Sequence, residues 1–409
     1  MATTAGATGA GRTPSDDAAV LADGCKHVET PAELSERIGR GRPLRIKFGI
    51  DPTGSELHLG HAVVLHKMQQ FVELGHDVTL LIGDATALIG DPSGRNDSRP
   101  PLTREQIEAN LQTYAQQAGL VLDLPRVTVR KNSEWLDRLD YAGMIRLMTQ
   151  TTVAQMLARE DFRKRFESQT PIALHEFLYP VAQAYDSVAL ACDVELGGDD
   201  QLFNFLLART YQQSAGQLPQ ICMTLPILEG TDGVVRMGKS RGNYIALTEP
   251  PNTQFGKVMS IPDGLIARWA RLADFRSEAE TLAIARGIDD GSRAPMEEKK
   301  ALAQAIVTRY HGAEAGRAAR DYFERTIQRK EVPSEMPELP RNGLEKIVDL
   351  LVAAQFAESK RAAERLVSQG GVRIDGIVVT DPKALWTAKA PAVLQSGSRR
   401  FVRVVSSER

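Results

Sequence analysis

The chain has 409 residues and a formal net charge of −2, and 42% of its residues are hydrophobic and 25% charged. This length exceeds what one core usually serves, so we expect two or three domains of a globular protein. No apolar run is long enough to cross a membrane. Cys25, Cys192 and Cys222 are far apart and form no CxxC pair, which argues against a disulfide framework and structural zinc and favours a cytoplasmic location.

Residues 1–23 are expected to form a disordered tail. They are rich in Ala, Gly and Thr, and they contain neither the apolar stretch of a secretory signal nor the repeated arginines of a transit peptide. Segments of this composition rarely bury enough apolar surface to fold.

Strand and helix patterns alternate over residues 24–250, which predicts an α/β domain with a Rossmann-like parallel sheet. A helix is expected from His58 to Leu74. The expected strands cover residues 45–50, 78–82, 126–130, 192–196 and 221–228. Such sheets bind ligands beyond the carboxyl ends of their strands, so we expect the functional site in the loops there.

Two histidines open the helix that follows the first of these strands, in the run His58-Leu59-Gly60-His61. Residues at i and i+3 share a helix face. The free N–H groups and positive dipole end of a helix N-terminus suit a phosphate. Gly60 would let a flat base approach the backbone. Taken alone, the pair is more often explained by a surface helix that carries two histidines.

A second segment, Arg236-Met237-Gly238-Lys239-Ser240, lies in a loop punctuated by glycine. Cations on a mobile loop can close over a leaving pyrophosphate, although a solvated basic loop has the same composition. Together, the two segments resemble the HIGH and KMSKS signatures of class I aminoacyl-tRNA synthetases. Arg236 and Gly238 stand in place of a lysine and a serine of the second signature.

Three polar residues form a stripe on an otherwise apolar helix. Tyr179, Gln183 and Asp186 fall at i, i+4 and i+7 and therefore share one face. Buried polar groups need hydrogen-bond partners. A small polar ligand or an internal network would each supply them.

Residues 251–330 are expected to form a helical domain, and residues 331–342, with three prolines, a linker. Residues 343–409 predict a small α+β unit with two helices, 344–354 and 359–369, a glycine pair, and short strands from Val372 onward. From Arg341 to Arg409, 12 Lys and Arg stand against 7 Asp and Glu, a local charge of +5 on a body of −7. This asymmetry indicates a polyanionic partner.

From Lys47 to the C-terminus, the chain resembles bacterial tyrosyl-tRNA synthetases, in particular the branch with a Lys-x-Gly-x-Asp-Pro-Thr opening. The matching stretches are residues 49–53, 88–94, 179–186, 197–201 and 236–240. Several ordered motifs are a stronger signal than any one of them. The tail resembles an S4 RNA-binding domain, with the match in residues 359–376.

The resemblance implies activation of L-tyrosine with ATP and Mg²⁺, transfer of tyrosine to tRNA(Tyr), and a homodimer. It implies no organic cofactor, no zinc and no membrane association. Asp186 would accept the phenolic hydroxyl. Lys47 stands where many members carry a tyrosine that shares this hydrogen bond.

The implied site residues fall into four groups. The catalytic residues are Thr53, His58, His61, Arg95, Arg99, Arg236 and Lys239. The tyrosine-binding residues are Gly49, Asp51, Asp91, Tyr179, Gln183, Asp186 and Gln201. The ATP-binding residues are His58, Gly60, His61, Gly198, Asp200, Lys239 and Ser240. The RNA-binding residues are Lys360, Arg361, Arg365 and Arg373, and no metal-binding residue is expected.

Two other functions fit parts of the sequence. A repurposed or inactive paralogue, acting as an RNA-binding or resistance protein, would explain Arg236 and Gly238. A tryptophan enzyme on the same scaffold is disfavoured by Asp186 and by the S4-like tail. Tyrosine-dependent ATP–pyrophosphate exchange, compared with tryptophan in the same assay, would separate the three.

Overall fold

The computed structural model describes residues 12–93, 102–328, 336–341, 343–387, 391–397 and 400–406. The chain divides into two compact units. The first contains the residues up to Pro250 together with Lys257–Leu302, and the second contains Pro251–Gly256 and Ala303–Arg409.

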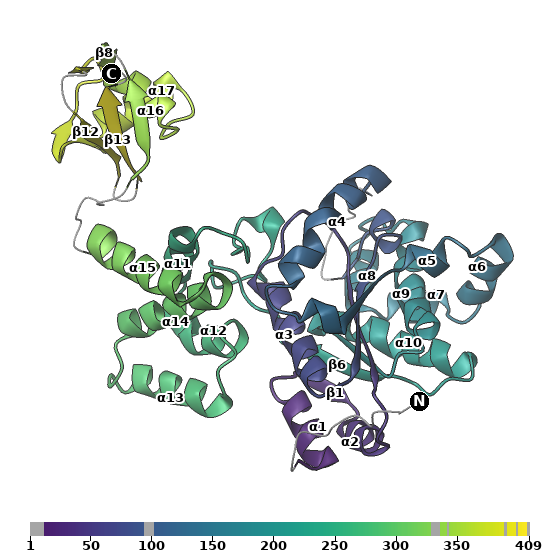
Figure 1. The fold of residues 1–409 in the computed structure, drawn as a ribbon. Helices are drawn as coiled ribbons and strands as arrows, with labels where there is room; N and C mark the ends of the chain where they lie inside the picture. The colour runs from purple at the N-terminus through teal and green to yellow at the C-terminus, as the bar shows by residue number, and fades with distance from the viewer. Residues whose placement is uncertain are drawn as a thin grey trace. The chain divides into compact units, whose positions relative to one another are not determined.

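A six-stranded sheet forms the centre of the first unit (Figure 1). Its strands are β1 (His27–Glu29), β2 (Arg45–Ile50), β3 (Asp77–Ile82), β4 (Val127–Lys131), β5 (Val194–Gly198) and β6 (Ile221–Leu225). The spatial order is β1-β6-β5-β2-β3-β4, and every pairing is parallel except that of β1 with β6. From β2 the chain proceeds to β3 and β4 on one side, whereas β5 and β6 lie on the other. This reversal between β2 and β5 is where open α/β sheets form a crevice.

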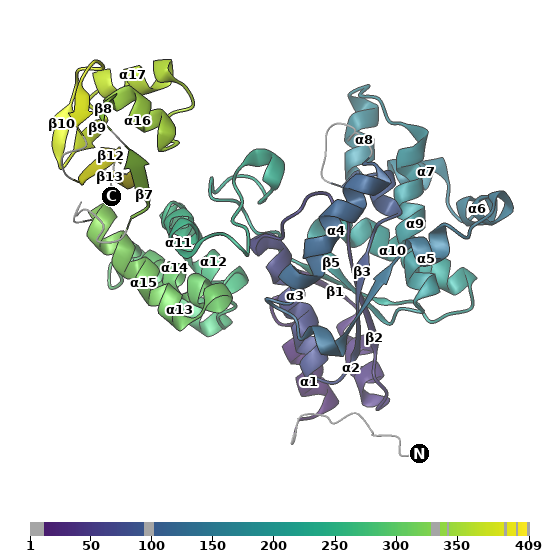
Figure 2. The ribbon, with the colours of Figure 1, turned by 45° about the horizontal axis from the view of Figure 1, so that its top comes forward.

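Helices cover both faces of this sheet. Helix α3 (Leu59–Glu73) lies on one side, and α9 (Leu178–Ala189) and α10 (Leu202–Ser214) lie on the other (Figure 2). The remaining helices before residue 250 are α1 (Pro14–Ala22), α2 (Pro31–Gly39), α4 (Arg104–Ala118), α5 (Ser133–Leu136), α6 (Tyr141–Met148), α7 (Val153–Leu157) and α8 (Glu160–Glu167). The expected α/β class is confirmed.

The disordered tail expected over residues 1–23 is wrong for residues 12–23, which include α1. Thr13 caps this helix, because its side chain accepts from the backbone N–H of Asp16 while the Asp16 carboxylate accepts from the backbone N–H of Thr13. Leu21 is fully buried. A reciprocal cap and the buried side chains of Ala18 and Leu21 thus order a segment of otherwise weak hydrophobicity. Residues 1–11 lie outside the described part of the chain.

The helical domain expected over residues 251–330 is divided between the two units. Its helices are α11 (Pro251–Met259), α12 (Ile266–Leu272), α13 (Glu278–Asp289), α14 (Pro295–His311) and α15 (Ala313–Phe323). The segment around α12 belongs to the first unit because it packs there. The Phe275 ring stacks on the His66 ring with centroids 3.7 Å apart, and Arg271 forms an ion pair with Asp23.

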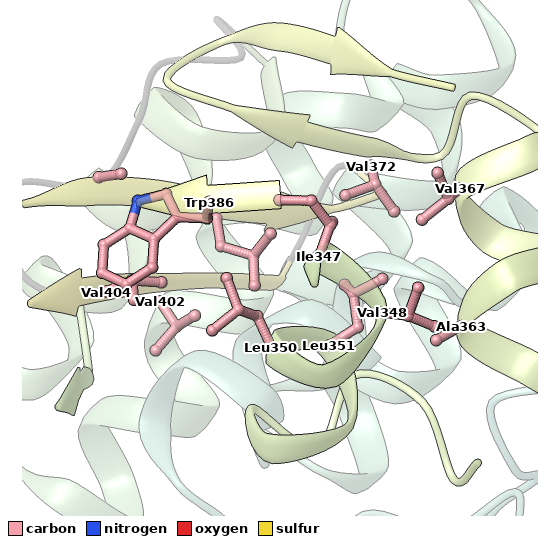
Figure 3. Close-up of a cluster of buried hydrophobic side chains, with 12 residues drawn as sticks. Ile347, Val348, Leu350, Leu351, Ala363, Val367, Val372, Trp386, Val402 and Val404 are labelled. Atoms are coloured by element: carbon pink, nitrogen blue, oxygen red, sulfur yellow. The ribbon is translucent and has the colours of Figure 1, made fainter. Parts of the chain in front are cut away.

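The C-terminal part of the second unit has its own core. Its helices are α16 (Ile347–Ala353) and α17 (Lys360–Ser368), and its strands are β7 (Glu338–Arg341), β8 (Leu344–Lys346), β9 (Val372–Ile374), β10 (Ile377–Val379), β11 (Leu385–Thr387), β12 (Ala392–Ser396) and β13 (Arg400–Ser406). Five strands form a sheet in the order β10-β9-β12-β13-β7, and β8 pairs with β11. Ile347, Leu351, Val367 and Trp386 pack together between these elements (Figure 3).

Two expectations for this region need correction. The linker expected over residues 331–342 is wrong for Glu338–Arg341, which form β7 and pair in parallel with β13. Pro340 is tolerated there because β7 is an edge strand, where a missing N–H breaks no ladder. The first helix begins at Ile347 and not at residue 344, since Leu344–Lys346 pair with β11. Pro333 lies outside the described residues.

Candidate active site

A cavity of about 670 Å³ lies at the carboxyl ends of β2 and β5 in the first unit. This volume suits a small ligand or cofactor. Every expected catalytic, ATP-binding and tyrosine-binding residue that the structure describes lines it: Gly49, Asp51, Thr53, His58, Gly60, His61, Asp91, Tyr179, Gln183, Asp186, Gly198, Asp200, Gln201, Arg236, Lys239 and Ser240. Arg95 and Arg99 lie outside the described residues. Segments that are far apart in the sequence therefore meet around one space.

The two histidines are fixed by the start of α3. His58 is the N-cap residue, and its Nδ1 accepts from the backbone N–H of Gly60 over 3.2 Å. His61 Nδ1 accepts from the backbone N–H of His58 over 3.1 Å. Burial lowers the pKa of both imidazoles, that of His61 to about 3. Both rings are therefore neutral, and because each Nδ1 is an acceptor, each proton resides on Nε2 as a donor.

The loop that carries Arg236 and Lys239 is tied to the cavity wall. Arg236 Nη1 forms an ion pair with Asp200 Oδ2 over 2.7 Å. The Lys239 ammonium lies 5.8 Å from the centroid of the Tyr114 ring. A Cβ atom at Gly54 would lie 2.8 Å from Lys239 Nζ, so the absence of a side chain at Gly54 leaves room for this lysine.

Asp186 lies at the deep end of the cavity and is 3% exposed. Its carboxylate accepts from Asn132 Nδ2 over 3.2 Å and from Trp135 Nε1 over 2.8 Å. Burial raises the pKa of Asp186 to about 7. Sequence reasoning missed Asn132 and Trp135. Their signal is position, since Asn132 follows β4 directly, Trp135 lies in the short helix α5 just after it, and parallel strands end at the same edge of the sheet.

Lys47 and Glu195 form a buried ion pair beside this end. Lys47 Nζ and Glu195 Oε1 are 2.9 Å apart, and each side chain is 1% exposed. The Ser187 hydroxyl accepts from Lys47 over 2.7 Å and donates to Glu195 over 3.0 Å. Burial is the largest influence and opposes the charge on Lys47, but the carboxylates of Glu195 and Asp186, together with the hydrogen bond to Glu195, raise the pKa of Lys47. The ammonium of Lys47 is thus held within the protein's own network.

Two carboxylates, Asp51 and Asp91, line the cavity near Tyr179. Asp51 accepts from Thr86 Oγ1 over 2.9 Å and from the Tyr179 hydroxyl over 3.0 Å. Burial, with Asp91 adding to it, raises the pKa of Asp51 to about 7. Two neighbouring carboxylates that are only partly exposed gain from a cationic ligand, so this part of the cavity suits an ammonium group.

The four expected RNA-binding residues belong to the second unit, and all are exposed. Lys360, Arg361 and Arg365 are on α17, and Arg373 is on β9. Lys360 forms an ion pair with Asp349 over 2.8 Å. Within the described ranges, no group of three or more His, Cys, Asp or Glu is arranged to hold a metal ion, and no helix is long and apolar enough to span a membrane.

Comparisons with known proteins cover nearly the whole chain. A family model described as tRNA synthetases class I (W and Y) matches residues 40–328, and one described as S4 domain matches residues 345–385. A protein of Thermotoga maritima named tyrosine–tRNA ligase is 48% identical over 396 residues, which cover 97% of this chain and 99% of that protein. A Bordetella pertussis protein of the same name is 50% identical over 393 residues, with coverages of 95% and 96%.

Solved structures give the same picture for the fold. A tyrosyl-tRNA synthetase of Archaeoglobus fulgidus, complexed with L-tyrosine, matches with a TM-score of 0.62 at 24% identity and covers 75% of this chain and 99% of its own. The tyrosyl-tRNA synthetase of Aeropyrum pernix matches with a TM-score of 0.62 at 21% identity and covers 76% of this chain and 99% of its own. At these identities the likeness concerns the fold.

Proposed function

The chain belongs to the tyrosine–tRNA ligase family of class I aminoacyl-tRNA synthetases, and we propose that the cavity of the first unit is where it activates L-tyrosine with ATP. The single observation that carries this proposal is the shared cavity. His58, Lys239 and Asp186 come from three distant segments and line the same space. Tyrosine is then transferred from the adenylate to tRNA(Tyr).

Tyrosine is proposed to bind with its phenol at the deep end. The phenolic hydroxyl donates to Asp186, whose carboxylate is already oriented by Asn132 and Trp135. Phenylalanine would leave this buried carboxylate without its ligand donor, which costs about 1–3 kcal/mol or more. The ammonium group meets acceptors at Asp91, Tyr179 and Gln183. A tryptophan ligand offers no hydroxyl to Asp186, so tyrosine is the better match.

The first chemical step needs no general base, because the attacking carboxylate of tyrosine is already ionised. Catalysis then consists of positioning and of charge stabilisation on the phosphoryl oxygens. His58 and His61 supply neutral Nε2–H donors, and Arg236 and Lys239 supply positive charge. Arg95 and Arg99 are proposed to add charge at the same phosphates. ATP is proposed to bind as its Mg²⁺ complex.

The second unit is proposed to bind the tRNA. The S4 match and the exposed cations of α17 support this role. A patch of Lys and Arg gains affinity for a structured RNA through its phosphates. The cytoplasm is the proposed location, because tRNA is charged for translation there.

A homodimer is proposed from exposed apolar side chains of the first unit. Tyr141, Ile145 and Met148 on α6, Phe166 on α8 and Leu174 before α9 are exposed. A large exposed apolar surface usually marks an interface. Light scattering should give twice the chain mass of 44.8 kDa; a monomer at micromolar concentration would contradict the proposal.

Tyrosine-dependent ATP–pyrophosphate exchange tests the proposed function. The wild-type protein should exchange with tyrosine and not with phenylalanine or tryptophan. A folded protein without exchange would instead favour a repurposed RNA-binding or resistance protein, the alternative that Arg236 and Gly238 suggest.

A further inference from the structure

Two buried residues behind the cavity, Asn204 and Arg159, were not among the residues expected from the sequence. Asn204 on α10 is 1% exposed, and Arg159, which precedes α8, is 4% exposed. Neither belongs to the cavity wall. Both are nevertheless linked by hydrogen bonds to residues that line the cavity. The atom types in these bonds determine which group is the donor and which is the acceptor.

Arg159 determines which way the Asn204 amide faces. Arg159 Nη1 donates to Asn204 Oδ1 over 3.1 Å. A guanidinium has donors only, so the Asn204 atom that faces it must be the carbonyl oxygen. Arg159 itself is held, because Nη2 donates to Ser93 Oγ and Nε lies 2.8 Å from Asp161 Oδ1. The orientation of the amide is therefore fixed, although nitrogen and oxygen have nearly the same shape.

Asn204 in turn orients two glutamines of the cavity wall. Its Nδ2 donates to Gln183 Oε1 over 2.8 Å and to Gln201 Oε1 over 3.0 Å. Each glutamine must then direct its NH₂ group elsewhere. Gln183 Nε2 donates to Glu195 Oε1 over 3.2 Å, and Gln201 Nε2 donates to Asp91 Oδ2 over 3.1 Å. Each amide nitrogen in this chain therefore meets at least one acceptor.

The orientation of the Gln183 amide determines whether the cavity presents a hydrogen-bond acceptor or a donor to an ammonium group. A carbonyl oxygen can accept twice, so Gln183 Oε1 can accept from Asn204 and also from a ligand. A flipped Gln183 amide would turn its donors toward the ammonium and its oxygen toward the Glu195 carboxylate, and both contacts would be repulsive. The NH₂ group of Asn204 excludes this flip.

We propose that Asn204, oriented by Arg159, is a positioning residue that keeps the acceptor of Gln183 directed at the amino group of the substrate. The inference rests on the function proposed for the cavity. It adds that recognition of the ammonium depends on a donor that does not touch the ligand.

The substitution Asn204→Asp tests this role, since it keeps the shape of the side chain and replaces the donor by an acceptor. Dissociation constants are measured by calorimetry on the full chain for two probes. Tyramine has the ammonium without the carboxylate, and 3-(4-hydroxyphenyl)propionate has the carboxylate without the ammonium. The dissociation constant of tyramine should rise at least about tenfold, the effect of losing a hydrogen bond to a charged group. That of the propionate should change little.

Gln212→Glu is the matched control on the same helix. Gln212 is fully buried, and its Nε2 donates to the backbone oxygen of Cys192 over 2.8 Å. The same amide-to-acid change should leave both dissociation constants unaltered there. If Asn204→Asp does not fold, Asn204→Ala, which removes the donor without adding charge, gives the same comparison.

The outcomes separate the two proposals. Equal weakening of both probes, or of neither, in a protein that still binds tyrosine would overturn the positioning role alone. A wild-type protein that binds no tyrosine would overturn the function of the cavity and the positioning role together.

Discussion

Individual residues of the cavity have different tasks in the proposed reaction. His58 and His61 are neutral, because burial lowers the pKa of both. They donate hydrogen bonds without adding charge. Lys239 brings a positive charge to the same cavity. A positive charge stabilises the transition state most where negative charge develops. In adenylate formation, negative charge develops on the departing pyrophosphate.

Lys239→Ala should therefore slow adenylate formation by about 10²–10³, the usual loss for one transition-state contact, and should leave the dissociation constant of tyrosine unchanged. Rapid-quench kinetics give the rate, and equilibrium dialysis gives the dissociation constant. Lys164→Ala is the control, since Lys164 is exposed on α8 and paired with Glu160. Equal losses in rate and tyrosine binding would contradict a role in the transition state.

Asp51 is expected to make tyrosine binding depend on pH. Burial raises its pKa to about 7, while an unfolded chain releases this proton near pH ~4. The folded protein thus binds more protons between these values, and the contribution of Asp51 to stability is present below the lower value and is lost as the pH rises through the higher one. An ammonium ligand binds the ionised Asp51 carboxylate more tightly than the protonated one. The stability that the ligand adds to the protein therefore increases as Asp51 ionises.

The dissociation constant of tyrosine should consequently fall as the pH rises from about 6 to about 8, where Asp51 ionises. Asp51→Asn should flatten this dependence, leaving only what Asp186, whose pKa is also raised by burial to about 7, contributes. Calorimetry in buffers of matched ionic strength measures both curves. A steeper dependence in the variant than in the wild type would refute the assignment to Asp51.

At the residue scale, the sequence predicts groups that sit in short distinctive runs. His58 and Lys239 are of this kind. Asn132 and Trp135 are not, because their contact with Asp186 depends on how β4 and α9 approach each other; Asn132 is 54 residues from Asp186 in the chain. Asn204 is a buried amide within a helix and belongs to no distinctive sequence run. Its proposed role follows only from its contacts with Arg159, Gln183 and Gln201.

Among the local elements, the loop around Arg236 and Lys239 is held by one buried side chain in addition to the Arg236–Asp200 ion pair. Asn243 is 4% exposed. Its Oδ1 accepts from the backbone N–H of Gly238 over 2.9 Å, and its Nδ2 donates to Asp232 Oδ2 over 2.7 Å. Asn243 therefore joins the two ends of the loop and presents Lys239 between them.

Asn243→Ala should loosen this loop and lower the exchange rate at saturating substrates by about tenfold or more, the effect of one or two lost buried hydrogen bonds. Tyrosine binding should persist. Limited proteolysis should cut near Gly238 sooner than in the wild type. Gln217→Ala is the control, since Gln217 is likewise an amide, partly buried, whose Nε2 donates to the backbone oxygen of Val188 away from the cavity. An unchanged rate and cleavage pattern would show that the loop is held by other contacts.

Whole elements could be predicted where hydrophobic periodicity is strong. The strand expected at residues 45–50 is β2, and α3 differs from its expected bounds by one residue at each end. The short strands β1 and β7 could not be predicted, because they pair at sheet edges with partners far along the chain. Likewise, α1 is specified by a cap and the buried side chains of Ala18 and Leu21, and such a helix leaves little periodic signal.

At the scale of the whole molecule, the two units are proposed to carry separable tasks. Substitutions in one unit should then leave the task of the other unchanged. Arg361 and Arg365 are exposed on α17, where Ala363 and Val367 face the core. Arg361→Glu with Arg365→Glu should weaken tRNA binding and reduce the slope of log affinity against log salt by about 0.7–0.9 per lost phosphate contact. Exchange of pyrophosphate requires no tRNA and should not change.

Filter binding of tRNA(Tyr) over a salt series, with the exchange assay on the same preparations, measures both effects. Arg40→Glu is the control, because Arg40 is exposed next to α2, near the amino end of β2 and away from the cavity. It changes the net charge without touching the S4 region. If the control lowered the salt slope as much as the α17 pair, the contribution would come from overall charge. A loss confined to the pair, with exchange intact, would place phosphate recognition on α17.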